Sequence, residues 1–183
     1  MLREQINKDI KEAMQRKNEL LLLVLRGINA TIHNREIEKR TKLSKTSAFA
    51  EASADREKLK KLEELSKLTE EEVVEAISSE AKKRKEAIIE FSALGGSASG
   101  GEKEKIDNAI NKEKLELEIL KKYLPEQMGE EQIKKEVKKT IAELGAVGLK
   151  DIGKVMSAAM SKLKGKAEGG TVSKIVAELL RTE

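Results

Sequence analysis

The sequence predicts an all-α protein, and three observations support that prediction. The 183 residues include one proline, apolar residues recur at helical spacing along most of the chain, and no window alternates apolar with polar residues as a strand would. The apolar fraction is 38%, which is low for a globular protein, and another 38% of the residues are charged. We therefore expect thin cores built between amphipathic helices.

The N-terminal part of the chain is expected to contain a helical hairpin followed by longer helices. The predicted elements are a helix through Leu2, Ile6, Ile10 and Ala13, a turn near Lys17–Asn18, a helix from Leu21 to about Glu38, and a stripe of leucines from Leu59 to Leu68. Thr69 and Glu72 then form a capping box, in which each side chain can bond the other residue's backbone N–H. A helix carrying Val73 to Phe91 is expected to follow.

A glycine-rich break and a proline divide the rest. Residues 92–101 contain four glycines and are expected to form a flexible break. The next helix should run from about Glu102 to Tyr123, where Leu124-Pro125 ends it because proline disfavours the helical conformation of the preceding residue. We place a domain boundary here, giving an N-terminal helical domain at 1–124 and a tail domain at 125–183.

Three short amphipathic helices are predicted in the tail domain. Their apolar stripes begin at Ile133, Ile152 and Val172, and Gly145 stands where a left-handed residue commonly follows a helix. About 60 residues with three apolar stripes is near the lower limit for an independent core.

Lysines concentrate in the tail, and we interpret them as a phosphate-binding surface. Residues 148–174 hold six lysines against Asp151 and Glu168, a local net charge of +4. The predicted RNA-binding residues here are Lys150, Lys154, Lys162, Lys164 and Lys166. The alternative is purely structural, since lysines at a helix C-terminus are favoured by the helix dipole whatever their function.

A second basic run lies in the N-terminal part and is also a candidate for RNA contact. It consists of Lys82, Lys83, Arg84 and Lys85. On a helix these residues spread around most of the circumference, so some stems must lie against a neighbour. A solvated helix face is the default interpretation.

Several other chemistries are disfavoured by the residues present. The chain has no Cys and a single His, His33, so thiolate metal sites and a zinc centre are not expected. Gly148 to Lys154 fits the glycine and lysine spacing of a phosphate-binding loop, but Val155 lacks the hydroxyl that holds Mg²⁺ and no strand precedes it. We expect no catalytic residues, metal or cofactor. The three aromatic residues also argue against base stacking.

No segment resembles a secretory signal or a membrane span. The N-terminus is charged throughout, and the longest apolar run covers only residues 20–25, whereas a span needs about 20 residues. We expect a cytoplasmic protein with no membrane partner.

Three strings in the C-terminal part, KYLPEQM (122–128), GKVMSAAMSKLKGKAEG (153–169) and VSKIVAELL (172–180), closely resemble the YqeY-like family. That family is related to the C-terminal region of the B subunit of aspartyl/glutamyl-tRNA amidotransferase (GatB/YqeY). Residues 9–40, 68–91 and 114–125 have the same family character. Residues 44–66 and about 95–111 look like insertions, expected to be loops or helix extensions.

The resemblance implies an N-terminal helical domain, a three-helix tail and a tRNA-binding accessory role. It also implies a label of carbon–nitrogen ligase with glutamine as amido-N-donor, although no catalytic site is recognisable in this chain. The alternative is a helical scaffold for an aminoacyl-tRNA synthetase or an amidotransferase subunit. An amidotransferase-like enzyme acting alone is the weakest of the three hypotheses.

Overall fold

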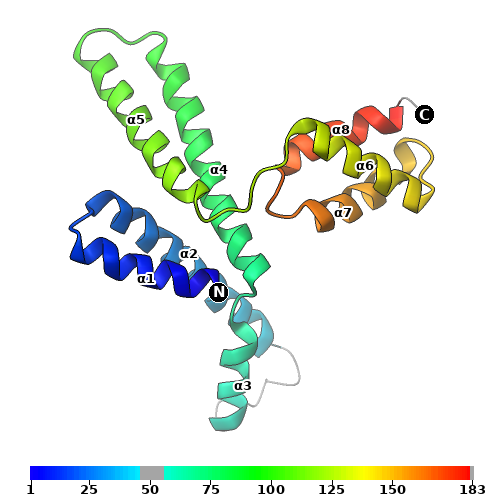
Figure 1. Cartoon of the computed structure of the whole chain (residues 1–183), viewed down its shortest axis with the longest axis horizontal. Coiled ribbons are helices and arrows are strands. Elements are labelled where there is room, and N and C mark those ends of the chain that lie inside the picture. Colours follow the sequence, from blue (N-terminus) through cyan, green and yellow to red (C-terminus); the bar gives the residue numbers. More distant parts are fainter. Residues whose placement is uncertain (46–55, 182–183) are drawn as a thin grey trace. The chain divides into compact units, whose positions relative to one another are not determined.

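The computed structural model describes residues 1–45 and 56–181, and this part of the chain is helical with no strand (Figure 1). The prediction of an all-α protein is therefore confirmed. The helices are α1 (Leu2–Gln15), α2 (Glu19–Ser44), α3 (Arg56–Ser66), α4 (Glu70–Gly95), α5 (Gly101–Lys121), α6 (Glu130–Leu144), the short 3-10 helix η2 (Leu149–Asp151), α7 (Ile152–Leu163) and α8 (Gly169–Arg181).

Two compact units make up the structure, and each is described by itself. The first spans Met1–Tyr123 and the second, which we call the tail unit, spans Leu124–Glu183. No helix in the described ranges is long and apolar enough to span a lipid bilayer.

The first unit begins with the antiparallel pair α1 and α2. Lys17 adopts a left-handed φ of 52° in the turn, and the side chain of Asn18 caps α2 by accepting a hydrogen bond from Leu21 N. α2 continues to Ser44, beyond the end expected near Glu38. Ion pairs stabilise this extension of α2, since Lys39 pairs with Glu72 and Arg40 pairs with Glu63.

The core of the first unit lies where α1, α2, α4 and α5 pack together. Its largest fully buried side chains are Ile6, Leu25, Ile28, Ile32, Val73, Ile77 and Leu120. All the buried residues of α4 lie between Val73 and Ala81, so the second half of this 26-residue helix extends past the shared core. The capping box of Thr69 and Glu72 is present as predicted.

One expectation about a loop is corrected by the helices. The break expected at 92–101 is shorter, because α4 continues to Gly95 and α5 begins at Gly101. The helix propensities of Ser92 and Ala93 allow α4 to continue through these residues. Of the 44–66 segment, residues 46–55 lie outside the described part, whereas 56–66 form α3, which packs on α2 through Leu62.

A buried carboxylate joins three elements of the first unit. Glu36 of α2 is 7% exposed, and its carboxylate accepts hydrogen bonds from both terminal nitrogens of Arg3 on α1. Its Oε1 also accepts a hydrogen bond of 3.2 Å from the backbone N–H of Leu68, just before α4. The charge is thus paired as well as hydrogen-bonded, which burial requires.

The tail unit has three main helices, as predicted. Its buried core consists of Ile133, Val137, Ile141, Ala146, Val155, Ala159, Leu163, Val172, Ile175, Val176 and Leu180. Gly145 ends α6 in the left-handed conformation, with φ of 58°. Met128 N donates to Lys166 O at 2.8 Å, which ties the segment before α6 to the turn between α7 and α8.

Candidate nucleic-acid interface

The predicted tail lysines lie at the two ends of α7 and do not form one cluster. Lys150 in η2 and Lys154 in the first turn of α7 are at one end, whereas Lys162, Lys164 and Lys166 are at the other. Eight residues separate Lys154 from Lys162, which corresponds to about 12 Å along a helix and a rotation of about 80°. The structure therefore presents two groups of cations along one helix.

At the start of α7, the lysines are exposed. Lys154 has a side chain 80% exposed and lies 3.7 Å from Oδ1 of Asp151. The other oxygen of Asp151 accepts a hydrogen bond from Val147 N, so this carboxylate also shapes the loop before α7. Lys150 is exposed and makes no ion pair with any residue the structure describes.

At the end of α7, Lys162 is held against α6. Its Nζ lies 2.5 Å from Oε2 of Glu143 and 3.8 Å from Oε1 of Glu136, and it donates to the hydroxyl of Thr140 at 3.4 Å. The hydrogen bond from Lys162, followed by its charge, lowers the pKa of Glu143, and the same hydrogen bond raises the pKa of Lys162. This cation is largely neutralised in the free protein.

The turn after α7 places Lys164 and Lys166 on the surface. Lys164 leaves the helix with ψ of 124°, and Gly165 follows with a left-handed φ of 75°. The backbone here is fixed, because Gly165 O accepts from Gln127 Nε2 and Lys166 O from Met128 N. The side chains of both lysines are exposed on a turn with defined geometry.

Three residues of the basic run at 82–85 form ion pairs within the first unit. Arg84 faces α5, where its Nε lies 2.8 Å from Oε2 of Glu116 and 3.5 Å from Oε2 of Glu113. Lys82 and Lys83 are exposed but sit beside Glu86 and Glu80. Lys85 is exposed as well. Thus Arg84 joins α4 to α5, and the side chains of the three lysines are exposed.

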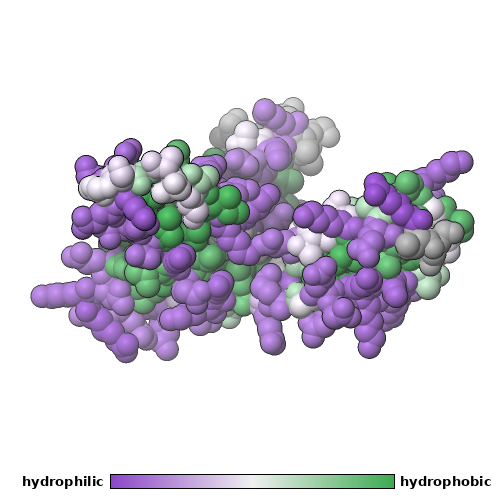
Figure 2. All heavy atoms as spheres, turned by 90° about the horizontal axis from the view of Figure 1, so that it is seen from above, coloured by the Kyte–Doolittle hydropathy of each residue, from purple (hydrophilic) through white to green (hydrophobic). Residues whose placement is uncertain are grey.

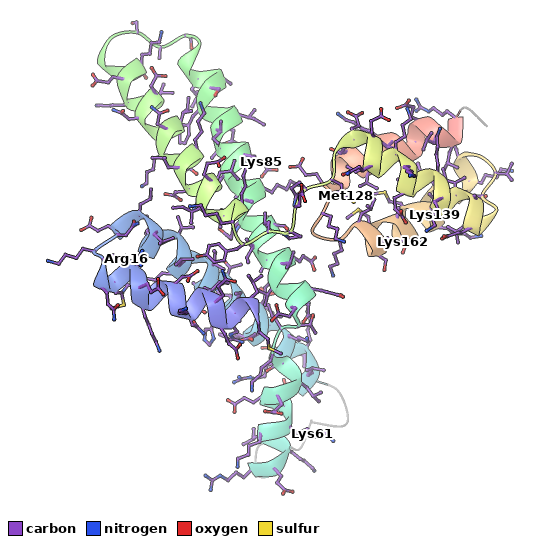
Figure 3. The ribbon with its side chains drawn as sticks, viewed as in Figure 1. Arg16, Lys61, Lys85, Met128, Lys139 and Lys162 are labelled. Atoms are coloured by element: carbon purple, nitrogen blue, oxygen red, sulfur yellow. The ribbon has the colours of Figure 1, made fainter. Side chains whose placement is uncertain are left out.

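Sequence reasoning missed three exposed lysines on α6. Lys135, Lys138 and Lys139 lie opposite the buried stripe of that helix, and none makes an ion pair within the described ranges. Their spacing of three and four places them on one face. That spacing was the available signal, but α6 as a whole holds four lysines against four glutamates and so shows no excess of positive charge. Lys139 and Lys162 are labelled on neighbouring helices in Figure 3.

The visible surface is polar, and the described residues include no cluster of metal ligands. Hydrophilic side chains cover most of the visible face in Figure 2. Within the described residues, no group of three His, Asp or Glu side chains could hold a metal ion. His33 lies in a groove of the first unit lined by Arg3, Arg40 and Lys61, among others.

The fold and surface together define a two-unit helical protein whose tail carries exposed lysines. The chain belongs to the YqeY-like family, because the family model described as Yqey-like protein matches residues 48–180. The match covers α3 to α8 apart from the last residue of α8, so the resemblance of residues 9–40 stays an interpretation. No curated protein matches the chain.

Proposed function

We propose that this protein is a tRNA-binding accessory module whose tail unit holds RNA through phosphate contacts. The single observation that carries the proposal is the set of exposed lysines around α6 and α7. The tail sequence holds eleven Lys and Arg residues against nine Asp and Glu residues. The relation to a tRNA-dependent amidotransferase, implied by the resemblance, identifies tRNA as the RNA to test first.

The lysines favour contact with phosphates over reading of bases. An ammonium group contributes a point charge and releases counterions when it meets a phosphate. The described tail residues 124–181 include no aromatic side chain that could stack on a base. We therefore expect binding that depends strongly on salt and weakly on sequence.

The proposed contacts are assigned by exposure. The proposed contacts at the two ends of α7 are Lys150, Lys154, Lys164 and Lys166, and those on α6 are Lys135, Lys138 and Lys139. Additional RNA contacts are proposed in the first unit at Lys82, Lys83 and Lys85. Arg84 is left out because it pairs with Glu116. The protein would hold RNA while a separate enzyme performs the chemistry.

A salt titration of tRNA binding tests this function. We expect binding at about 50 mM salt, and four phosphate contacts would give a slope near −3.6 on a log–log plot, or about a 150-fold loss by 200 mM. The Lys150/Lys164/Lys166→Ala variant should bind more weakly, with a slope reduced by about 2 to 3.

The matched control removes the same charge elsewhere. Lys103, Lys112 and Lys114 are exposed on α5, and their replacement by Ala should leave the affinity within about twofold. Absence of tRNA binding at 50 mM salt, or equal losses in the two triple variants, would refute the proposal.

A protein-interaction scaffold is the second candidate, and an exposed apolar group favours it. Leu144, Val147 and Leu149, around the loop between α6 and α7, are 47%, 77% and 49% exposed. Apolar groups of this kind commonly mark protein contacts. Nuclease-resistant binding to a purified aminoacyl-tRNA synthetase or amidotransferase subunit, lost in Val147→Ser/Leu149→Ser, would support this role.

A further inference from the structure

Glu143 of α6 pairs with Lys162, a predicted RNA-binding lysine that the assignment by exposure leaves out. It lies one helical turn after Lys139 on α6, and the charge of Lys139 contributes to the lowered pKa of its carboxyl group. Its Oε2 lies 2.5 Å from the ammonium group of Lys162 on α7. Glu143 thus pairs with Lys162 across α6 and α7, whereas Lys139 is a neighbour on its own helix that makes no ion pair in the described part of the chain.

The other neighbours of Lys162 also belong to α6. Oε1 of Glu136 is 3.8 Å away, and the hydroxyl of Thr140 accepts a hydrogen bond at 3.4 Å. Thr140 is buried, and its own hydroxyl donates to Glu136 O, so the surroundings of the ammonium group are fixed by the helix. Lys162 is therefore directed toward α6 instead of outward, although its side chain is 36% exposed.

We propose that Glu143 masks Lys162, and that an RNA phosphate must displace this carboxylate to use the ammonium group. This inference rests on the proposed function and adds a specificity residue to the same surface. A mask of this kind penalises single phosphates and weak encounters, because the existing ion pair must first be broken. An RNA whose shape also engages Lys164 and Lys166 can offset that penalty.

The arrangement predicts that removing one negative side chain increases binding. Glu143→Gln keeps the size of the side chain but removes the charge, so the ion pair is lost and the ammonium group of Lys162 becomes available to phosphate. We expect about threefold to tenfold tighter tRNA binding at 100 mM salt, with a salt slope steeper by about 1. Glu143→Ala should give the same result, since Glu143 is exposed at the surface and its loss leaves the core intact.

A control separates unmasking from a general charge effect. Glu131 is exposed on the same helix and makes no ion pair among the described residues. Glu131→Gln changes the net charge equally but releases no lysine, so its affinity and salt slope should match those of the unmodified protein. In the double variant Glu143→Gln/Lys162→Ala, most of the gain should disappear.

The outcomes distinguish this inference from the proposed function. Equal effects of Glu143→Gln and Glu131→Gln, or a full gain in the double variant, would overturn the masking role while leaving tRNA binding intact. Failure of the unmodified protein and all variants to bind tRNA at 50 mM salt would refute the proposed function and the mask with it.

Discussion

The phenol of Tyr123 donates a hydrogen bond of 2.6 Å to Oδ2 of Asp9. Tyr123 is the last residue of the first unit, and Asp9 lies on α1, 114 positions earlier in the chain. The bond joins the segment after α5 to the first helix, while the tyrosine ring is 8% exposed. Burial and the charge of Asp9 both favour the neutral phenol.

The ionisation of Tyr123 gives the first prediction. Burial, followed by the hydrogen bond to Asp9 and its charge, raises the pKa of Tyr123. Because the chain has one Tyr and no Trp, ultraviolet absorbance reports this group alone. In urea it should titrate near pH 10, whereas the folded protein should show no phenolate there. A folded protein that titrates near pH 10 would contradict the contact.

The hydrogen bond between Tyr123 and Asp9 also makes the free energy of unfolding depend on pH in a defined direction. Because the pKa is raised in the folded state, its stabilising effect is complete below pH 10 and is lost as the pH rises further. Tyr123→Phe should lower the free energy of unfolding by about 1 to 2 kcal/mol at pH 7, measured by urea titration. The difference between the two proteins should shrink above pH 10.

The second prediction concerns Arg84 and Glu116, between α4 and α5. The side chain of Glu116 is 4% exposed, so Arg84→Met would leave a buried carboxylate without its cation. We expect a loss of about 3 kcal/mol in the free energy of unfolding. The double variant Arg84→Met/Glu116→Leu should recover most of it.

Lys83 provides the control for that experiment. Its side chain is 61% exposed, and Lys83→Met should change the stability by less than about 0.5 kcal/mol. A similar effect of Lys83→Met and Arg84→Met would mean that the contact between α4 and α5 does not depend on the buried charge pair.

The third prediction concerns Glu72 and the stability of the protein at low pH. Its carboxylate accepts hydrogen bonds from Lys39 Nζ at 2.8 Å and from Thr69 N at 2.8 Å. The bond from Lys39 is the largest cause of its lowered pKa, so the stabilisation is present above pH 4.5 and lost as the pH falls through the folded value. Glu72→Gln should cost about 1 kcal/mol at pH 7 and much less near pH 3. A constant difference across this range would contradict the assignment.

The fourth prediction concerns two glycines of the tail unit, whose replacement by alanine should change the free energy of unfolding in opposite directions. Gly153 lies inside α7, and an added Cβ would meet nothing within 4 Å, so Gly153→Ala should stabilise the protein by about 0.5 to 1 kcal/mol. Gly145 has a φ of 58°, where alanine is strained, so Gly145→Ala should destabilise by about 1 kcal/mol. Thermal unfolding of the two variants would check both signs.

Periodicity predicted the helices well because local chemistry specifies them. The capping box at Thr69, the turn at Lys17–Asn18 and the left-handed Gly145 each depend on residues within a few positions. The end of α2 was misplaced because its last turns are supported by Glu63 and Glu72, which lie far away in the sequence.

The candidate site was harder to predict for the same reason. The lysines were visible in the sequence, but spacing could not reveal that Lys162 faces Glu143, 19 residues earlier on another helix. Nor could it separate Arg84, which packs inward, from Lys82 and Lys83, which remain exposed. Side-chain direction around a helix depends on which neighbours pack against it, and that is a tertiary property.

The two halves of α4 have a consequence for dynamics. The helix is about 39 Å long, but its buried residues all lie between Val73 and Ala81, while its last residue, Gly95, lies beside Ile106 of α5. Amide protons near Ile77 should therefore exchange with deuterium only when the whole unit unfolds, and those near Leu94 should exchange through fraying of the hairpin tip. A single continuous helix would thus contain both the slowest and some of the fastest exchanging amides of the unit.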